Sequence, residues 1–169
     1  MDAVTALLSR RSCRRYTDQE VSEQDVDTML QAAMAAPSAR NQQPWRFVLV
    51  RDKEKLARLS QATPHAGMLK TAALGVVVAG ETRDTACPEY WVQDCSAATQ
   101  NLLLAVHALG LGAVWIGVHP VPEREQAVRA LVDLPVGVEA LALIAIGHPA
   151  ESKPPSERFE PHFVHTESW

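Results

Sequence analysis

Four arginines crowd a short stretch near the N-terminus, SRRSCRRYT at residues 9–17. They lie within six residues of one another: Arg10, Arg11, Arg14 and Arg15. The planar guanidinium group binds two phosphate oxygens at once, and Ser12 adds a hydroxyl donor, so the cluster suits a dianionic phosphate. The alternative is a solvated basic patch. A short amphipathic helix is predicted over residues 2–9, and it favours binding because it fixes the backbone that carries the arginines.

A second polar stretch, APSARNQQPWRF at residues 36–47, combines a helix end, an amide-rich loop and the start of a strand. Its neutral donors and acceptors come from Ser38, Asn41, Gln42 and Gln43. Such groups recognise the edge of a heterocycle rather than a charge. The alternative is a loop whose amides satisfy its own backbone.

A third stretch, GLGAVWIGV at residues 110–118, has the apolar and β-branched character of a strand. Gly117 lies near the end of this strand, where the lack of a side chain lets the backbone approach a flat ligand closely. The alternative is a core strand with a glycine bulge. None of the three stretches is decisive by itself.

The composition predicts one domain over residues 1–169. The chain is 47% apolar and 21% charged, with a net charge of -4, which argues against a general nucleic-acid surface. No apolar run is long enough to span a bilayer, and the N-terminus lacks the pattern of a signal peptide, so we expect a cytoplasmic protein. Three cysteines without a CxxC pair, and an HxxH in a Pro-flanked tail, predict no metal site.

The periodicity predicts helices alternating with strands around a single sheet, in an α+β or α/β sandwich. Helices are expected over residues 2–9, from Ser22 to Met34, after Asp52, over 89–109 and from Pro122. Strands are expected over residues 45–51, 74–80, 112–118 and 140–147. The long 89–109 helix is apolar around much of its girth, which is typical of a helix that is buried or shared between subunits.

The last 22 residues, 148–169, have a different character. They hold four of the eleven prolines, so little regular structure is expected. They also carry large apolar side chains that are costly to leave in water: Phe159, Phe163, Val164 and Trp169. We expect this tail to dock on a surface, and a partner subunit is the favoured one.

Taken together, RRSCRRY, APSARNQQPW, DCSAATQNLLLAVHALGLGAVWIG and AIGHPAE resemble the nitroreductase-like FMN flavoproteins. The resemblance covers nearly the whole chain and keeps the order of the motifs. It implies an α+β sandwich with a central mixed sheet flanked by helices and an extended C-terminal segment that docks on the partner subunit. It also implies a homodimer with two FMN sites at the subunit interface.

The resemblance further implies which residues bind FMN. The phosphate, ribityl chain and pyrimidine edge fall to Arg10, Arg11, Ser12 and Arg14. The loop of the other subunit would line the isoalloxazine with Pro37, Ser38, Ala39, Asn41 and Gln43. The strand end beside flavin N5 corresponds to Ile116 and Gly117. The tail would meet the phosphate with Arg158 and Lys153.

The implied activity is that of an FMN-dependent oxidoreductase. It would take hydride from NADH or NADPH at flavin N5 and pass electrons to a nitroaromatic, quinone or related small-molecule acceptor, in a ping-pong cycle. Because the cofactor carries the chemistry, no catalytic side chain is expected; Arg14 is expected to stabilise the charge of the reduced flavin. The sequence has no GxSxG, HExxH, P-loop or GxGxxG motif. The alternatives are another reductive substrate (an enone, a halogenated compound or a flavin) and a non-catalytic flavin- or nucleotide-binding protein.

Overall fold

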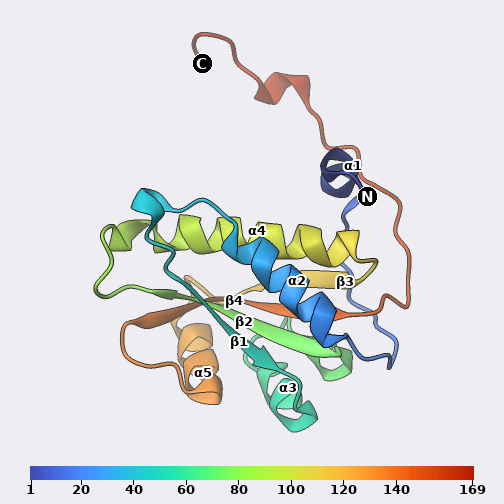
Figure 1. The fold of residues 1–169 in the computed structure, drawn as a ribbon, viewed down its shortest axis with the longest axis vertical. Coiled ribbons are helices and arrows are strands. Elements are labelled where there is room, and N and C mark those ends of the chain that lie inside the picture. The colour runs from blue at the N-terminus through green and yellow to red at the C-terminus, as the bar shows by residue number, and fades with distance from the viewer.

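A four-stranded antiparallel sheet forms the centre of the computed structural model, which describes residues 1–169 (Figure 1). The strand order is β1-β2-β4-β3. The strands are β1 (Trp45–Val50), β2 (Leu74–Glu81), β3 (Gly112–Gly117) and β4 (Val138–Gly147). The two central strands, β2 and β4, are buried along nearly their whole length, as their continuous apolar sequences indicate.

Helices cover both faces of this sheet. One face carries α2 (Glu23–Met34) and α4 (Trp91–Ala108), and the other carries α3 (Lys53–Leu59) and α5 (Pro122–Val132) (Figure 1). Alternate residues of β2 divide between the two layers, with Val76 and Val78 in the core cluster under α2 and α4 and Val77 in the other. The remaining helix, α1 (Ala3–Ser9), lies beside the C-terminal end of α4.

The helix start and stop signals of the sequence are confirmed. The Ser22 hydroxyl accepts the backbone N–H of Asp25 at 3.1 Å and begins α2, while Asp52 caps α3 in the same way. Gly110 follows α4 with a positive φ of 78°, which is the C-terminal glycine conformation. The long helix begins at Trp91, two residues later than expected, because residues 88–90 form a 3-10 turn.

The α+β class is confirmed, but the expected mixed strand directions are not found among β1–β4, since every neighbouring pair is antiparallel. Helices on both faces bury β2 and β4 along nearly their whole length, so an antiparallel strand here has the same continuous apolar sequence as a parallel one. Parallel pairing occurs only outside the named strands, where Ser12 bridges Ala113 of β3.

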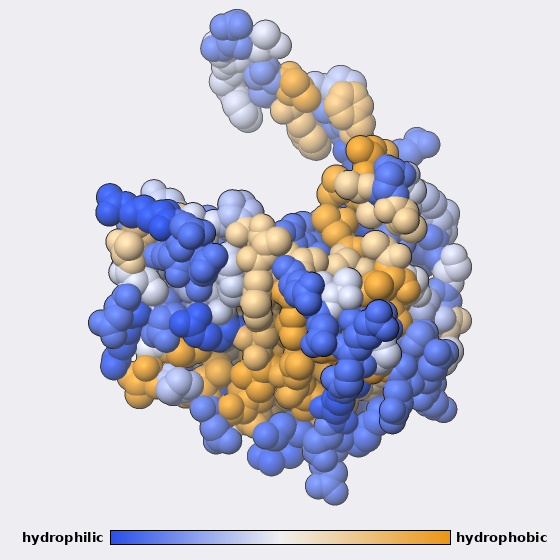
Figure 2. Space-filling view, viewed as in Figure 1, coloured by the Kyte–Doolittle hydropathy of each residue, from blue (hydrophilic) through white to orange (hydrophobic).

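The tail beyond β4 first pairs with the body through a bridge between Tyr16 and Pro149. Its end, with one short 3-10 turn at Pro161–Phe163, extends away from the body of the molecule (Figures 1 and 2). Its large apolar side chains are exposed on this chain: Phe159 is 78% exposed, Phe163 73% and Trp169 100%. None of the helices has both the length and the apolar character needed to cross a membrane.

Candidate functional site

The arginine segment, residues 10–14, is fixed along the free edge of β3. Cys13 donates its backbone N–H to the Ala113 carbonyl at 2.9 Å, next to the parallel bridge formed by Ser12. Tyr16 anchors the end of the segment: its hydroxyl lies 2.7 Å from the Cys13 carbonyl oxygen and 3.0 Å from that of Ala145. Burial raises the pKa of this phenol well above its usual range, so it remains a neutral hydrogen-bond donor. The arginines are therefore presented from a rigid backbone.

Arg10 is the most confined cation of the segment. Its pKa is lowered, first by partial burial and then by the positive charges of Arg158 and Arg11. No carboxylate lies within ion-pair distance of any of these three arginines. Arg10 and Arg158 line a common hollow of about 610 Å³ between α1 and the tail. Glu157 also lines this hollow but forms no ion pair with either arginine. The converging like charges therefore fit an anionic ligand, which would relieve their repulsion.

Two other predicted residues connect the arginine segment to the start of the tail. Arg11 donates through Nη1 to the Pro154 carbonyl at 2.8 Å, and Lys153 donates through Nζ to the Ser12 carbonyl at 3.3 Å. Lys153 also pairs with Glu151 at 2.9 Å, and this hydrogen bond is the main reason that the pKa of Glu151 is lowered. These residues line a polar hollow of about 250 Å³. Within this chain they position the tail against the segment.

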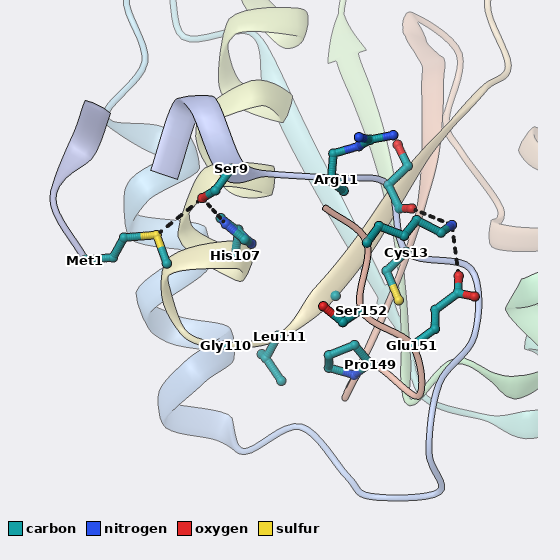
Figure 3. A pocket seen from close by; sticks show the side chains of 13 residues that line it. Met1, Ser9, Arg11, Cys13, His107, Gly110, Leu111, Pro149, Glu151 and Ser152 are labelled. Carbon is teal, nitrogen blue, oxygen red and sulfur yellow. Dashed lines mark hydrogen bonds and ion pairs between the residues drawn. The ribbon is translucent and has the colours of Figure 1, made fainter. Parts of the chain in front are cut away.

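The same hollow contains a histidine that the sequence analysis did not single out. His107, in the last turn of α4, places Nε2 2.8 Å from the Ser9 hydroxyl at the end of α1 (Figure 3). Burial and then the charge of Arg10 lower the pKa of His107, which favours the neutral imidazole. The hydroxyl of Ser9 also donates to the Thr5 carbonyl at 2.6 Å. The link holds α1, and with it the arginine segment, at the C-terminal end of α4.

Arg14, Ile116 and Gly117 come together in another hollow of about 590 Å³ along β3. A Cβ added at Gly117 would meet no atom within 4 Å, so the backbone there is open to a ligand. The opposite wall comes from a loop that the sequence analysis missed, with Pro64, His65, Gly67 and Met68. Nothing in its spacing pairs this loop with β3, because the contact depends on how α3 and β2 are placed in the fold.

The amide-rich loop, residues 37–43, has an unusual backbone. Three of its residues adopt positive φ: Arg40 at 48°, Asn41 at 55° and Gln43 at 49°. Their side chains are exposed, while Ser38 caps the loop by accepting the Gln43 N–H at 3.0 Å. Gln42 instead turns inward, where its amide exchanges two hydrogen bonds with the backbone of Cys87. Gln42 therefore bonds to protein backbone, as the alternative interpretation expects of an amide, but that backbone is at Cys87 and not in the loop itself.

The amide-rich loop and the arginine segment lie at opposite ends of α4. Ala39 donates its N–H to Asp94 in the first turn, and Ser9 meets His107 in the last turn. At 1.5 Å per residue these two turns are about 20 Å apart. Within one chain the structure thus joins Arg10 with Arg158, and Arg14 with β3, but leaves residues 37–43 separate from both. The arginine segment and β3 suit an elongated ligand with an anionic end and a flat end.

Known proteins are similar to this chain in both sequence and fold. A family model described as the nitroreductase family matches residues 7–70 and 63–148. A protein of Methanothermobacter thermautotrophicus (strain Delta H), which carries the provisional name NADH dehydrogenase/NAD(P)H nitroreductase, is 42% identical over 100% of this chain and 88% of its own length.

Solved structures give the same result. A protein of that same provisional name from Parabacteroides distasonis superposes with a TM-score of 0.95 at 38% identity, covering 98% of both chains. An FMN-dependent nitroreductase from Clostridium difficile R20291 superposes with a TM-score of 0.92 at 31% identity, covering 98% of this chain and 99% of its own.

Proposed function

This chain belongs to the nitroreductase family, and we propose that it reduces nitroaromatic, quinone or related acceptors in a ping-pong cycle, from a site built by two copies of the chain. The protein is an oxidoreductase that takes FMN as its cofactor and NADH or NADPH as its co-substrate. The observation that carries the proposal is Arg10, half-buried near two further arginines with no carboxylate within ion-pair distance, on a segment whose Arg14 lines the open hollow along β3.

The residues present fit the two ends of FMN. A phosphate dianion would balance Arg10 and Arg158, which line one hollow and form no ion pair with a carboxylate. The flat ring system fits the hollow along β3, where Gly117 leaves the backbone open. The predicted ligands Arg11 and Ser12 of the segment, and Lys153 of the tail, lie where the segment and the tail meet.

When bound, FMN supplies the electron and hydride chemistry of the reaction. Arg14 would place its guanidinium at the end of the ring that carries negative charge after reduction, and would stabilise that charge. Ile116 and Gly117 would present the strand end to the ring. No side chain is needed as a nucleophile or general base, because the chain's task is to bind, orient and stabilise charge.

The second copy of the chain accounts for the loop of residues 37–43. These residues are about 20 Å from the arginine segment of their own chain along α4, so they reach a flavin only if it is bound by a partner. An apolar groove of about 410 Å³ lies between α1, α2 and α4, lined by small residues such as Ala32, Ala35 and Ala105. Apolar side chains gather on α1 and the neighbouring tail (Figure 2). We therefore propose a homodimer in which the tail of each chain covers its partner.

The first experiment is to mix the purified protein with FMN, desalt it and record its visible spectrum. Retained bands near roughly 370 and 450 nm, with about one FMN per chain, support the proposal. A colourless protein contradicts it. Stopped-flow reduction by NADH and NADPH, followed by an anaerobic panel of nitroaromatics, quinones, enones, halogenated compounds and free flavin, identifies the acceptor. A flavin that neither NADH nor NADPH reduces would indicate a binding protein.

A further inference from the structure

We propose that Asp94 is a positioning residue for the flavin site: its buried carboxylate fixes the shape in which residues 38–43 meet the cofactor of the partner chain. The inference rests on the proposed function, because it takes the FMN of the partner as the target of the loop. Asp94 touches neither the arginine segment nor β3, and it acts only through Ala39 and Gln42.

The carboxylate of Asp94 joins the first turn of α4 to the loop. Its Oδ1 accepts the backbone N–H of Ala39 at 2.9 Å, and its Oδ2 accepts Nε2 of Gln42 at 2.7 Å. Gln42 extends the connection, because its Oε1 accepts the Cys87 N–H at 2.8 Å and its Nε2 also donates to the Cys87 carbonyl at 2.9 Å. The amide of Gln42 can therefore point only one way, with its NH₂ group toward Asp94.

The loop above this connection needs support. Arg40, Asn41 and Gln43 all hold positive φ, a conformation that side chains with a Cβ adopt at a cost and keep only when the surroundings impose it. Asp94 and Ser38 bond to both ends of this stretch, at Ala39 and at Gln43. Without the carboxylate, the backbone would relax and the exposed polar side chains would no longer point in fixed directions.

The charge of Asp94 is itself informative. The side chain is 5% exposed, and no Lys, Arg or His lies within ion-pair distance of it. A buried carboxylate without a cation is costly, and an apolar side chain would pack there more favourably if filling space were the only need. The positive end of α4 offsets part of the charge. A carboxylate suits this position because it accepts hydrogen bonds from two neutral donors, the Ala39 N–H and the Gln42 amide.

Asp94→Asn tests this role with little change of volume. The substituted amide keeps an acceptor for the Ala39 N–H but turns its NH₂ group toward that of Gln42, which cannot flip without opposing the Cys87 N–H to another donor. We expect the dissociation constant for FMN to rise about tenfold. We also expect amide hydrogen exchange in residues 38–43 to accelerate in the full-length protein without FMN.

Two further variants complete the test. Glu89→Gln removes an exposed negative charge just before α4 and should change neither readout. If Asp94→Asn does not fold, Gln42→Ala breaks the same bond from the more exposed side and should act in the same direction.

The outcomes separate the two proposals. Faster exchange in the loop together with weaker FMN binding, in Asp94→Asn and in Gln42→Ala but not in Glu89→Gln, supports the positioning role. A lower melting temperature with unchanged FMN binding and unchanged loop exchange overturns it, because that is the result of a purely structural role. A wild-type protein that binds no FMN overturns the proposed function and this role together, while the loop exchange of Asp94→Asn still reports whether the carboxylate holds the loop.

Discussion

The two ends of α4 support functional residues in contrasting ways. At its C-terminal end the arginine segment pairs with β3 and is anchored by buried Tyr16, so a rigid backbone presents charge. At its N-terminal end the loop of residues 37–43 depends on a few side-chain hydrogen bonds and on left-handed residues. We therefore expect substitutions at the C-terminal end of α4 to change the charge offered to the ligand. Substitutions at the N-terminal end should change the conformation of the loop.

The largest effect is expected from removing charge at the rigid end. Arg10→Ala combined with Arg158→Ala removes two converging cations that no acid neutralises, so we expect the dissociation constant for FMN to rise about a hundredfold or more. Fluorescence titration measures it. Arg15→Ala is the matched control, since that side chain is 80% exposed and lies 3.9 Å from Glu151. If the double variant binds FMN as tightly as wild type, the phosphate of FMN is not bound at this end of α4.

Removing apolar side chains from the tail should separate the subunits. Phe159→Ser combined with Phe163→Ser takes away two large exposed rings, whose burial against a partner would stabilise the dimer. We expect the dissociation constant of the dimer to rise at least about tenfold, measured by sedimentation velocity over a dilution series. Glu167→Gln, farther along the same tail, should leave it unchanged. If the variant has the same dimer dissociation constant as wild type, the tail does not contribute to the contact between subunits.

A smaller effect is expected for Arg14, which we propose to act on the ring rather than on the phosphate. Arg14→Ala should weaken FMN binding about tenfold and lower the reduction potential of the bound flavin by about 30 mV, for a loss of ~1.4 kcal/mol. Spectroelectrochemistry measures the potential, with Arg15→Ala again as the control. If both quantities are unchanged, Arg14 does not contact the flavin.

The smallest effect concerns the pH dependence of stability. The pKa of His107 is lowered in the folded chain, so the unfolded chain binds this proton more readily. The stability that His107 contributes is present above its ordinary pKa of 6.5 and is lost as the pH falls from there toward the lowered value. We expect the melting temperature to drop more between about pH 7.5 and about pH 5.5 in wild type than in His107→Gln. Identical slopes, with His162→Gln in the exposed tail as the control, would contradict this.

Local signals in the sequence predicted the elements well. Ser22, Asp52 and Gly110 act through their immediate neighbours, so the helix ends that they mark could be predicted. The strand directions could not, because the apolar sequences of β2 and β4 suit either direction once both faces are covered. Only the placement of the connecting helices decides between them.

In the candidate site, too, features of contiguous residues could be predicted and contacts between distant residues could not. The arginine segment is contiguous, and its density of charge was visible in the sequence. The wall formed by His65 and its neighbours, the link of His107 to Ser9, and the bonds of Asp94 to the loop join residues distant in the chain. Gln42 shows the limit most clearly, because its amide looked like a ligand group yet serves the backbone of Cys87.

The central claim is that each flavin site takes its arginine segment from one chain and its loop from another. The most direct test mixes two full-length variants, each deficient in FMN binding: Arg10→Ala with Arg158→Ala, and Ala39→Trp, which fills the loop face. If the sites are shared, subunit exchange produces mixed dimers with one intact site each, and about a quarter of all sites should regain wild-type affinity for FMN. If each site is built within one chain, every site keeps a defect, and the mixture will bind no better than the two variants measured separately.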